Sequence, residues 1–181
     1  THGLCQRICN MPHGYTWQIM NRKIAHKEIS ISGSEHNPAF RDRRPVKFLK
    51  EILLGNDNLY DYLVNQCPDV ITANSLEELG ERMDTMDPDI EVDVDGMVRD
   101  VRHYDKMIDR GVAFHNDDQL RRIEHLRHWK GDKARTLKNQ KIEDPHAFPL
   151  VAIREFIISR KSMGGIQTDN HCRVLDIAGE P

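Results

Sequence analysis

The stretch FPLVAIREFII (residues 148–158) marks the point where the character of the sequence changes. It is an almost unbroken run of apolar and β-branched residues, which is typical of a buried strand. Helical periodicity dominates before it, whereas residues 165–168 and 172–176 have strand-like patterns joined by turns. We therefore predict an α+β chain, with a mostly helical domain and a small sheet over residues 1–147 and a β-rich segment over residues 148–181.

In the first 147 residues, apolar side chains recur with the 3.6-residue period of helices. One helix begins at a proline and ends at Gly55. Another begins with a capping box, in which the Ser75 hydroxyl accepts the Glu78 amide and the Glu78 carboxylate reaches back to the Ser75 amide. The predicted helices cover residues 1–9, 21–28, 45–54, 59–67, 75–86, 93–110 and 119–129, and the predicted strands residues 15–20 and 70–73.

The composition of the 181 residues is that of a folded, soluble protein. Hydrophobic residues make up 38% of the chain, charged residues 30%, and the net charge is −3. No stretch approaches the roughly 20 apolar residues that span a bilayer, and no charged-then-apolar leader opens the sequence. Four scattered cysteines, with no Asn-x-Ser/Thr acceptor, indicate free thiols and a cytoplasmic location.

The last predicted helix has an apolar side formed by Leu120, Ile123 and Leu126, which should face inward. Its polar side carries His125 and His128, which point in the same direction, as two metal ligands would. No cysteine, acid or third histidine stands at a supporting spacing. We therefore predict a solvated polar face and no metal site.

A basic segment runs from residue 121 to residue 141. Eight lysines and arginines face only Glu124 and Asp132, and Trp129 lies among them. Such a patch could neutralise the phosphates of a nucleic acid. Because the chain as a whole is acidic and only 6% aromatic, an anionic ligand or an acidic neighbouring domain is favoured over nucleic acid.

The stretch RKSMGGIQTD (residues 160–169) sets two cations before two adjacent glycines. Gly164 and Gly165 permit positive φ and leave the backbone bare, so that a flat or bulky group could lie against it. A tight hairpin explains the two glycines equally well. The sequence has no Gly-x-Gly-x-x-Gly, no P-loop and no Gly-x-Ser-x-Gly, and it therefore offers neither a phosphate cradle nor a serine nucleophile elbow.

Three parts of the sequence resemble FAD-dependent dehydrogenases of the fumarate reductase and 3-ketosteroid dehydrogenase superfamily. They are the stretches within residues 148–176, within residues 15–38, and over residues 127–133. Within that superfamily the chain looks most like the predicted ketosteroid-dehydrogenase-like oxidoreductases of bacteria. The similarity touches both ends and the middle of the chain, and so covers essentially all of it.

In this superfamily a FAD-binding domain is interrupted by a cap domain that closes over the flavin. The chain then returns to the FAD domain through a Gly-Gly turn close to the isoalloxazine ring. The resemblance implies that this chain is an internal fragment, with the cap over residues 1–147 and the start of the returning FAD-domain segment over residues 148–181. FAD would be the cofactor of the full-length parent, whose other partners would be a small-molecule substrate and the remainder of the FAD-binding domain. The isolated fragment would be inactive and would not hold FAD tightly.

The resemblance also implies roles for particular residues. Backbone donors beside a flavin stabilise the negative charge that develops on its reduction. The cofactor-binding candidates at the Gly-Gly turn are Ser162, Met163, Gly164 and Gly165. The catalytic candidates, which would act through substrate or flavin electrostatics, are Arg160 and Lys161. The substrate-binding candidates are Tyr15 and Trp17.

The sequence departs from the pattern of both named enzymes. Fumarate reductases are expected to carry a His-His-Thr-Met-Gly-Gly-like run, and the dicarboxylate-binding histidine has no counterpart in RKSMGG. Ketosteroid dehydrogenases commonly place tyrosine where Leu150 and Val151 stand. The implied activity is therefore hydride exchange between FAD and an unidentified carbon substrate. The alternative is a self-sufficient helical binding module that uses its basic face on an acidic partner.

Overall fold

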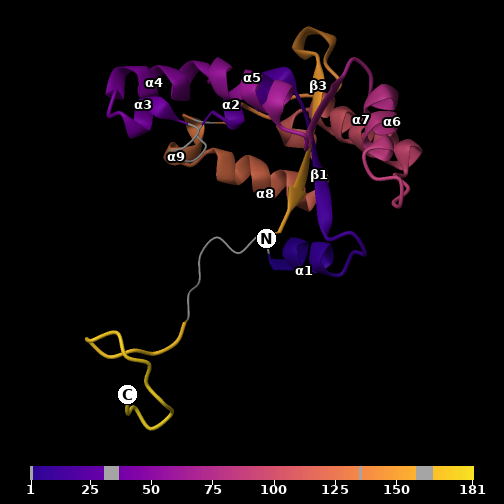
Figure 1. The fold of residues 1–181 in the computed structure, drawn as a ribbon. Helices are drawn as coiled ribbons and strands as arrows, with labels where there is room; N and C mark the ends of the chain where they lie inside the picture. The colour runs from indigo at the N-terminus through magenta and orange to yellow at the C-terminus, as the bar shows by residue number, and fades with distance from the viewer. Residues whose placement is uncertain (1, 31–36, 135, 158–164) are drawn as a thin grey trace. The chain divides into compact units, whose positions relative to one another are not determined.

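The computed structural model describes residues 2–30, 37–134, 136–157 and 165–181 (Figure 1). Contacts divide the chain into two compact units. Tyr15–Glu155 form the larger unit, and Thr1–Gly14 with Phe156–Pro181 form the smaller one.

The larger unit is built on a three-stranded sheet with the order β1-β3-β2. The strands are β1 (Tyr15–Asn21), β2 (Val70–Ala73) and β3 (Leu150–Phe156). β2 and β3 are antiparallel, with Val70 opposite Ile153. The end of β1 lies at the start of β3, where the Arg22 amide donates to the Pro149 carbonyl at 2.8 Å, so β1 also runs antiparallel to β3.

One face of the sheet is covered by α6 (Leu76–Thr85) and α7 (Val94–Arg110). Leu76 and Leu150 are fully buried there, each 0% exposed. The core cluster on this face consists of Ala73, Leu76, Leu79, Met83, Val98, Val101, Leu150 and Ala152.

The other face is covered by α2 (Arg22–Glu28) and α5 (Asp57–Gln66). Its core cluster consists of Met20, Ala25, Tyr60, Val70 and Val151. Because successive side chains of a strand point to opposite faces, Val151 packs here while its neighbour Leu150 packs on the first face. Burial of both faces confirms a buried strand at Leu150, Val151 and Ala152, whereas Phe156 and Ile157, later in the predicted run, are 49% and 41% exposed.

The predicted capping box at α6 forms with one change. Ser75 Oγ accepts the Glu78 amide at 3.1 Å, as predicted. The Glu78 carboxylate, however, accepts the amide of Asn74 at 2.9 Å rather than that of Ser75. Its other oxygen accepts from Arg82 at 2.7 Å, so the side chain is shared between the cap and an ion pair along the helix.

The remaining elements of the larger unit are short helices around the sheet. They are α3 (Pro38–Arg41), α4 (Pro45–Leu54), η1 (Val112–Phe114), α8 (Asp118–Arg127), α9 (Lys130–Lys133) and η2 (Pro145–Ala147). Within the described ranges, no helix has both the length and the apolar character needed to cross a membrane.

The prediction for the apolar side of α8 is only partly correct. Leu120 is buried, with 6% of its surface exposed. Ile123 and Leu126 are 36% and 61% exposed. Their spacing does place them on the same side of the helix as Leu120, but other elements cover α8 only near its beginning. Periodicity predicts which side of a helix is apolar and not how far along the helix that side is covered.

The smaller unit contains α1 (His2–Cys9) and the chain after β3. The strands predicted at residues 165–168 and 172–176 are not present as strands among the described residues. One isolated antiparallel bridge joins Thr168 and Val174. Both segments are short and exposed, with Ile166 at 74% and Val174 at 58%, so they lack the buried face that stabilises a longer ladder.

Candidate functional site

Gly165 is the part of the predicted flavin site that the structure describes. Arg160, Lys161, Ser162, Met163 and Gly164 lie outside the described residues. Gly165 is exposed, and no heavy atom lies within 4 Å of the place where a Cβ would stand. The backbone at this glycine is therefore open to a ring approaching from outside the chain.

The turn after Gly165 is organised by Asp169. Its Oδ1 accepts the amides of His171 at 2.8 Å and Arg173 at 3.0 Å. Its Oδ2 accepts from the Arg173 guanidinium at 2.7 Å. The Arg173 amide and guanidinium and the His171 amide lower the pKa of Asp169. The carboxylate is thereby held in its charged form and fixes the bridge between Thr168 and Val174.

Tyr15 begins β1 and is buried, with 4% of its surface exposed. Its hydroxyl donates to Asp87 Oδ2 at 3.3 Å. Burial, with the Asp87 carboxylate as the second cause, raises the pKa of Tyr15 above its ordinary value of 10.0. The phenol is therefore held neutral, as a hydrogen-bond donor inside the larger unit.

Trp17 lies next to Tyr15 on the same face of β1. The two rings are 6.1 Å apart and perpendicular, at 88°. Trp17 is half-buried and packs against the core cluster of α6 and α7. Its Nε1 is buried and has no hydrogen-bond partner among the described residues. The two predicted substrate-binding residues are thus brought together, while Gly165 belongs to the other unit.

Arg154 joins this pair and was not among the sequence candidates. Its guanidinium lies over the Tyr15 ring, 5.4 Å from the centroid. It also binds Asp69 Oδ1, through Nε at 2.8 Å and through the terminal nitrogen at 2.7 Å. The available signal was the arginine inside the apolar run of residues 148–158, because a charge in such a strand requires a partner. The partner, Asp69, comes from a distant segment.

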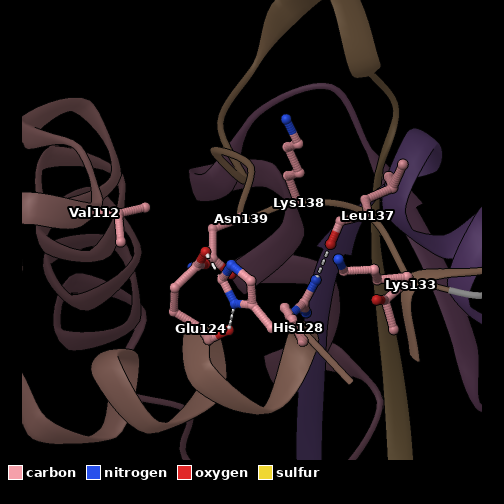
Figure 2. Close-up of a pocket in the computed structure, with 9 residues that line it drawn as sticks. Val112, Glu124, His128, Lys133, Leu137, Lys138 and Asn139 are labelled. Atoms are coloured by element: carbon pink, nitrogen blue, oxygen red, sulfur yellow. Dashed lines mark hydrogen bonds and ion pairs between the residues drawn. The ribbon is translucent and has the colours of Figure 1, made fainter. Parts of the chain in front are cut away.

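The basic segment predicted at residues 121–141 borders a pocket of about 640 Å³ (Figure 2). The pocket is bordered by α8 and its C-terminal end, by η1, by α9, and by the loop that follows α9. Its lining residues are Val112, Glu124, Arg127, His128, Lys133, Thr136, Leu137, Lys138 and Asn139.

No group of three potential metal ligands is found among the described residues, and His125 and His128 have different surroundings. His128 Nδ1 makes a hydrogen bond with the Glu124 carbonyl at 2.8 Å. His125 lines a different cavity, of about 490 Å³, together with Arg121, Arg122 and Leu126. The solvated polar face predicted for this helix agrees with these positions.

Comparison with known proteins places the chain beside flavoproteins. Residues 10–181 match the family model of the FAD-binding domain. A protein named KsdD-like steroid dehydrogenase from Mycobacterium tuberculosis (strain H37Rv) is 32% identical over 183 residues, and one so named from Mycolicibacterium smegmatis is 31% identical over 176. The alignments cover 100% and 97% of this chain but 32% of each relative, so the chain spans about a third of their length. No solved structure matches it.

Proposed function

Because the chain belongs to the FAD-binding domain family, we propose that it is one section of a FAD-dependent dehydrogenase that exchanges a hydride between flavin and a carbon substrate. The match over residues 10–181 is the observation that carries this proposal. Support comes from the relatives, which are named steroid dehydrogenases and are about three times longer, since the chain covers 32% of them. FAD, the cofactor of the family, supplies the hydride chemistry when bound.

The proposed cap, residues 1–147, contains all of the larger unit except its last residues, most of which belong to β3. The two apolar clusters of the larger unit, on either side of the sheet, give a rigid body that could exclude water from a reaction centre. β3 stands near the start of the proposed returning segment of residues 148–181, which contains Gly165 further along the sequence. In this arrangement Arg160 and Lys161 would provide positive charge next to substrate or flavin.

Gly165 would contact the flavin, together with Ser162, Met163 and Gly164. The open space around Gly165 supports this role, because a β-carbon would keep a flat ring away from the backbone. The amide would donate toward the edge of the ring where negative charge develops on reduction.

Tyr15 and Trp17 would form part of the wall that faces the substrate. Trp17 is half-buried, so part of the residue remains exposed to a ligand. Tyr15 is buried and bound to Asp87, and it would therefore support Trp17 from behind through their perpendicular ring contact.

The test is to purify the full-length parent and the 181-residue chain in parallel and to measure flavin absorbance and released FAD. We expect FAD in the parent and none in the isolated chain. A correctly folded but colourless parent would contradict the proposal.

The substrate class can be tested on the same parent under anaerobic conditions. The names of the relatives make a steroid the first probe, and the sequence resemblance makes it a ketosteroid, with succinate as the polar comparison. We expect the ketosteroid, in its saturated form, to bleach the flavin and succinate to leave it oxidised. Bleaching by succinate alone would contradict a steroid as the substrate class.

A further inference from the structure

We infer that the pocket between α8 and the loop of residues 136–139 binds a small organic anion. This inference depends on the charges and walls of the pocket and not on the flavin chemistry. Figure 2 shows the lining side chains and the hydrogen bonds among them.

The walls of the pocket are held in place by Glu28 of α2. Its Oε1 accepts from Arg127 at 3.0 Å and from the Leu137 amide at 3.1 Å. Arg127 also donates to the Leu137 carbonyl. One carboxylate outside the lining thus joins α8 to the loop, and the cavity is formed before any ligand arrives.

The loop is fixed at two further points. Asn139 donates to Glu124 Oε2 at 2.7 Å, which ties the far end of the loop to α8. Thr136 donates through its hydroxyl to the Asp132 carbonyl at 2.8 Å, which ties the near end to α9. Pre-organised walls lower the cost of binding, because less backbone must be ordered when the ligand enters.

The charges on the lining do not cancel. The Arg127 guanidinium is balanced by Glu28, and the Glu124 carboxylate accepts from Asn139. Lys133 and Lys138 have no ion pair within the described part of the chain. Lys133 and Lys138 share the lining with the single carboxylate of Glu124, so the lining keeps a net positive charge, which attracts an anion.

The same pocket has an apolar component. Val112 and Leu137 contribute aliphatic side chains to the lining, and Val112 is 55% exposed. A volume of about 640 Å³ lies well above what a phosphate ion alone would fill and falls in the range of small-molecule sites. The ligand class that matches both features is an organic phosphate or carboxylate with an apolar body.

Calorimetric titration of the 181-residue chain provides the test, with phenyl phosphate as the probe and inorganic phosphate and benzyl alcohol as comparisons. We expect phenyl phosphate to bind with a Kd of about 1 mM or tighter, inorganic phosphate to bind more weakly, and benzyl alcohol not to bind. Lys133→Gln and Lys138→Gln should each weaken the binding of phenyl phosphate by about fivefold or more.

The matched control is Lys106→Gln, which makes the same change of charge on the exposed surface of α7. It should leave the affinity unchanged, and thermal unfolding should show that all variants are folded. Val112→Asp supplies an independent variant, because a carboxylate on the pocket wall should repel the probe.

Three results would overturn the inference. One is equal weakening by Lys106→Gln and the two pocket variants, which would indicate nonspecific attraction. Another is binding that Val112→Asp leaves unchanged. The third is an acidic peptide that binds more tightly than phenyl phosphate, which would assign the pocket to a protein partner instead.

Discussion

Asn21 and Asp105 bind opposite edges of the same peptide group. The peptide joins Lys141 to Ile142, and its carbonyl accepts from Asn21 Nδ2 at 2.9 Å while its amide donates to Asp105 Oδ1 at 2.7 Å. Asp105 Oδ2 also accepts the Glu143 amide at 2.8 Å. Asn21 ends β1 and Asp105 lies on α7, so this peptide links the sheet to the helix that covers it.

Removal of either side chain should therefore destabilise the larger unit. Asn21 is 1% exposed and also caps α2, where its Oδ1 accepts the Ile24 amide at 3.0 Å. We expect Asn21→Ala to lower the free energy of unfolding by about 2 kcal/mol or more, since it removes the cap of α2 and leaves the Lys141 carbonyl without its side-chain donor. Urea unfolding measures this change. Asn65→Ala, on the exposed surface of α5, is the control and should cost about 0.5 kcal/mol or less.

The shared peptide also predicts that the two residues are energetically coupled. In a double-mutant cycle, Asn21→Ala with Asp105→Asn should cost less than the sum of the single changes by about 0.5 kcal/mol or more. Once the hydrogen bond at one edge of the peptide is lost, the segment is held less firmly. The hydrogen bond at the other edge then contributes less to stability. Strict additivity in urea unfolding would show that the two contacts act independently.

Asp105 should make stability depend on pH in an unusual direction. Burial is the main cause that raises the pKa of Asp105 above its ordinary value of 3.8, and the Ile142 and Glu143 amides oppose it. The folded state then keeps a proton that the unfolded state has already lost. As pH rises from 3.8 toward the raised pKa, the free energy of unfolding should fall in wild type relative to Asp105→Asn.

Unfolding of both proteins over a series of pH values measures that difference. Asp109→Asn, one turn further along α7 on an exposed carboxylate, is the control and should lack the trend. If the free energy of unfolding of wild type instead rises with pH relative to that of Asp105→Asn, the two amide donors outweigh burial in setting the pKa of Asp105.

Gly55, at the end of α4, should tolerate no side chain. Its φ is +100°, and a Cβ there would lie 2.8 Å from the His26 carbonyl oxygen. Gly55→Ala therefore adds a clash to backbone strain, and we expect a loss of about 3 kcal/mol or more. Gly111→Ala is the matched control: it follows α7 at φ +79° with nothing within 4 Å, so only strain of about 1–2 kcal/mol remains. Equal losses of stability for Gly55→Ala and Gly111→Ala in thermal unfolding would show that the clash with His26 contributes nothing.

Arg154 should contribute more to stability than a surface arginine. Its side chain is 20% exposed, holds Asp69 through two nitrogens, and covers the Tyr15 ring. We expect Arg154→Gln to lower the free energy of unfolding by about 2 kcal/mol, because Asp69 loses its partner. Arg102→Gln, on an arginine bound to Glu77 and Glu143 at the exposed surface, should have a smaller effect. The same loss for both in urea unfolding would contradict the special role of Arg154.

Local signals made most helices predictable. The end of α4 at Gly55 and the hydroxyl cap of α6 at Ser75 depend on residues close in the sequence, and the structure contains both. The four-residue helices α3 and α9 were missed because they are too short to show a periodic pattern. The position of β3 between β1 and β2 was not predictable either, since it joins segments far apart in the sequence.

The residues of the candidate site likewise divide into those that lie in one local stretch of sequence and those that come from distant segments. The resemblance identified Tyr15 and Trp17, and because they stand two residues apart on one strand their rings are in contact in the structure. Asp87 and Arg154 complete their surroundings from distant segments, and no local pattern relates them to Tyr15. Resemblance carried the cofactor prediction, which the match to the FAD-binding domain confirms.

The proposed contact between flavin and bare backbone is tested most directly by FAD affinity in the full-length parent carrying Gly165→Val. Ala178→Val is the control, because it adds similar bulk at an exposed position of the same unit. We predict that Gly165→Val weakens FAD binding by about tenfold or more, while Ala178→Val leaves it unchanged. Equal, undiminished FAD affinity in the two folded variants would contradict the account.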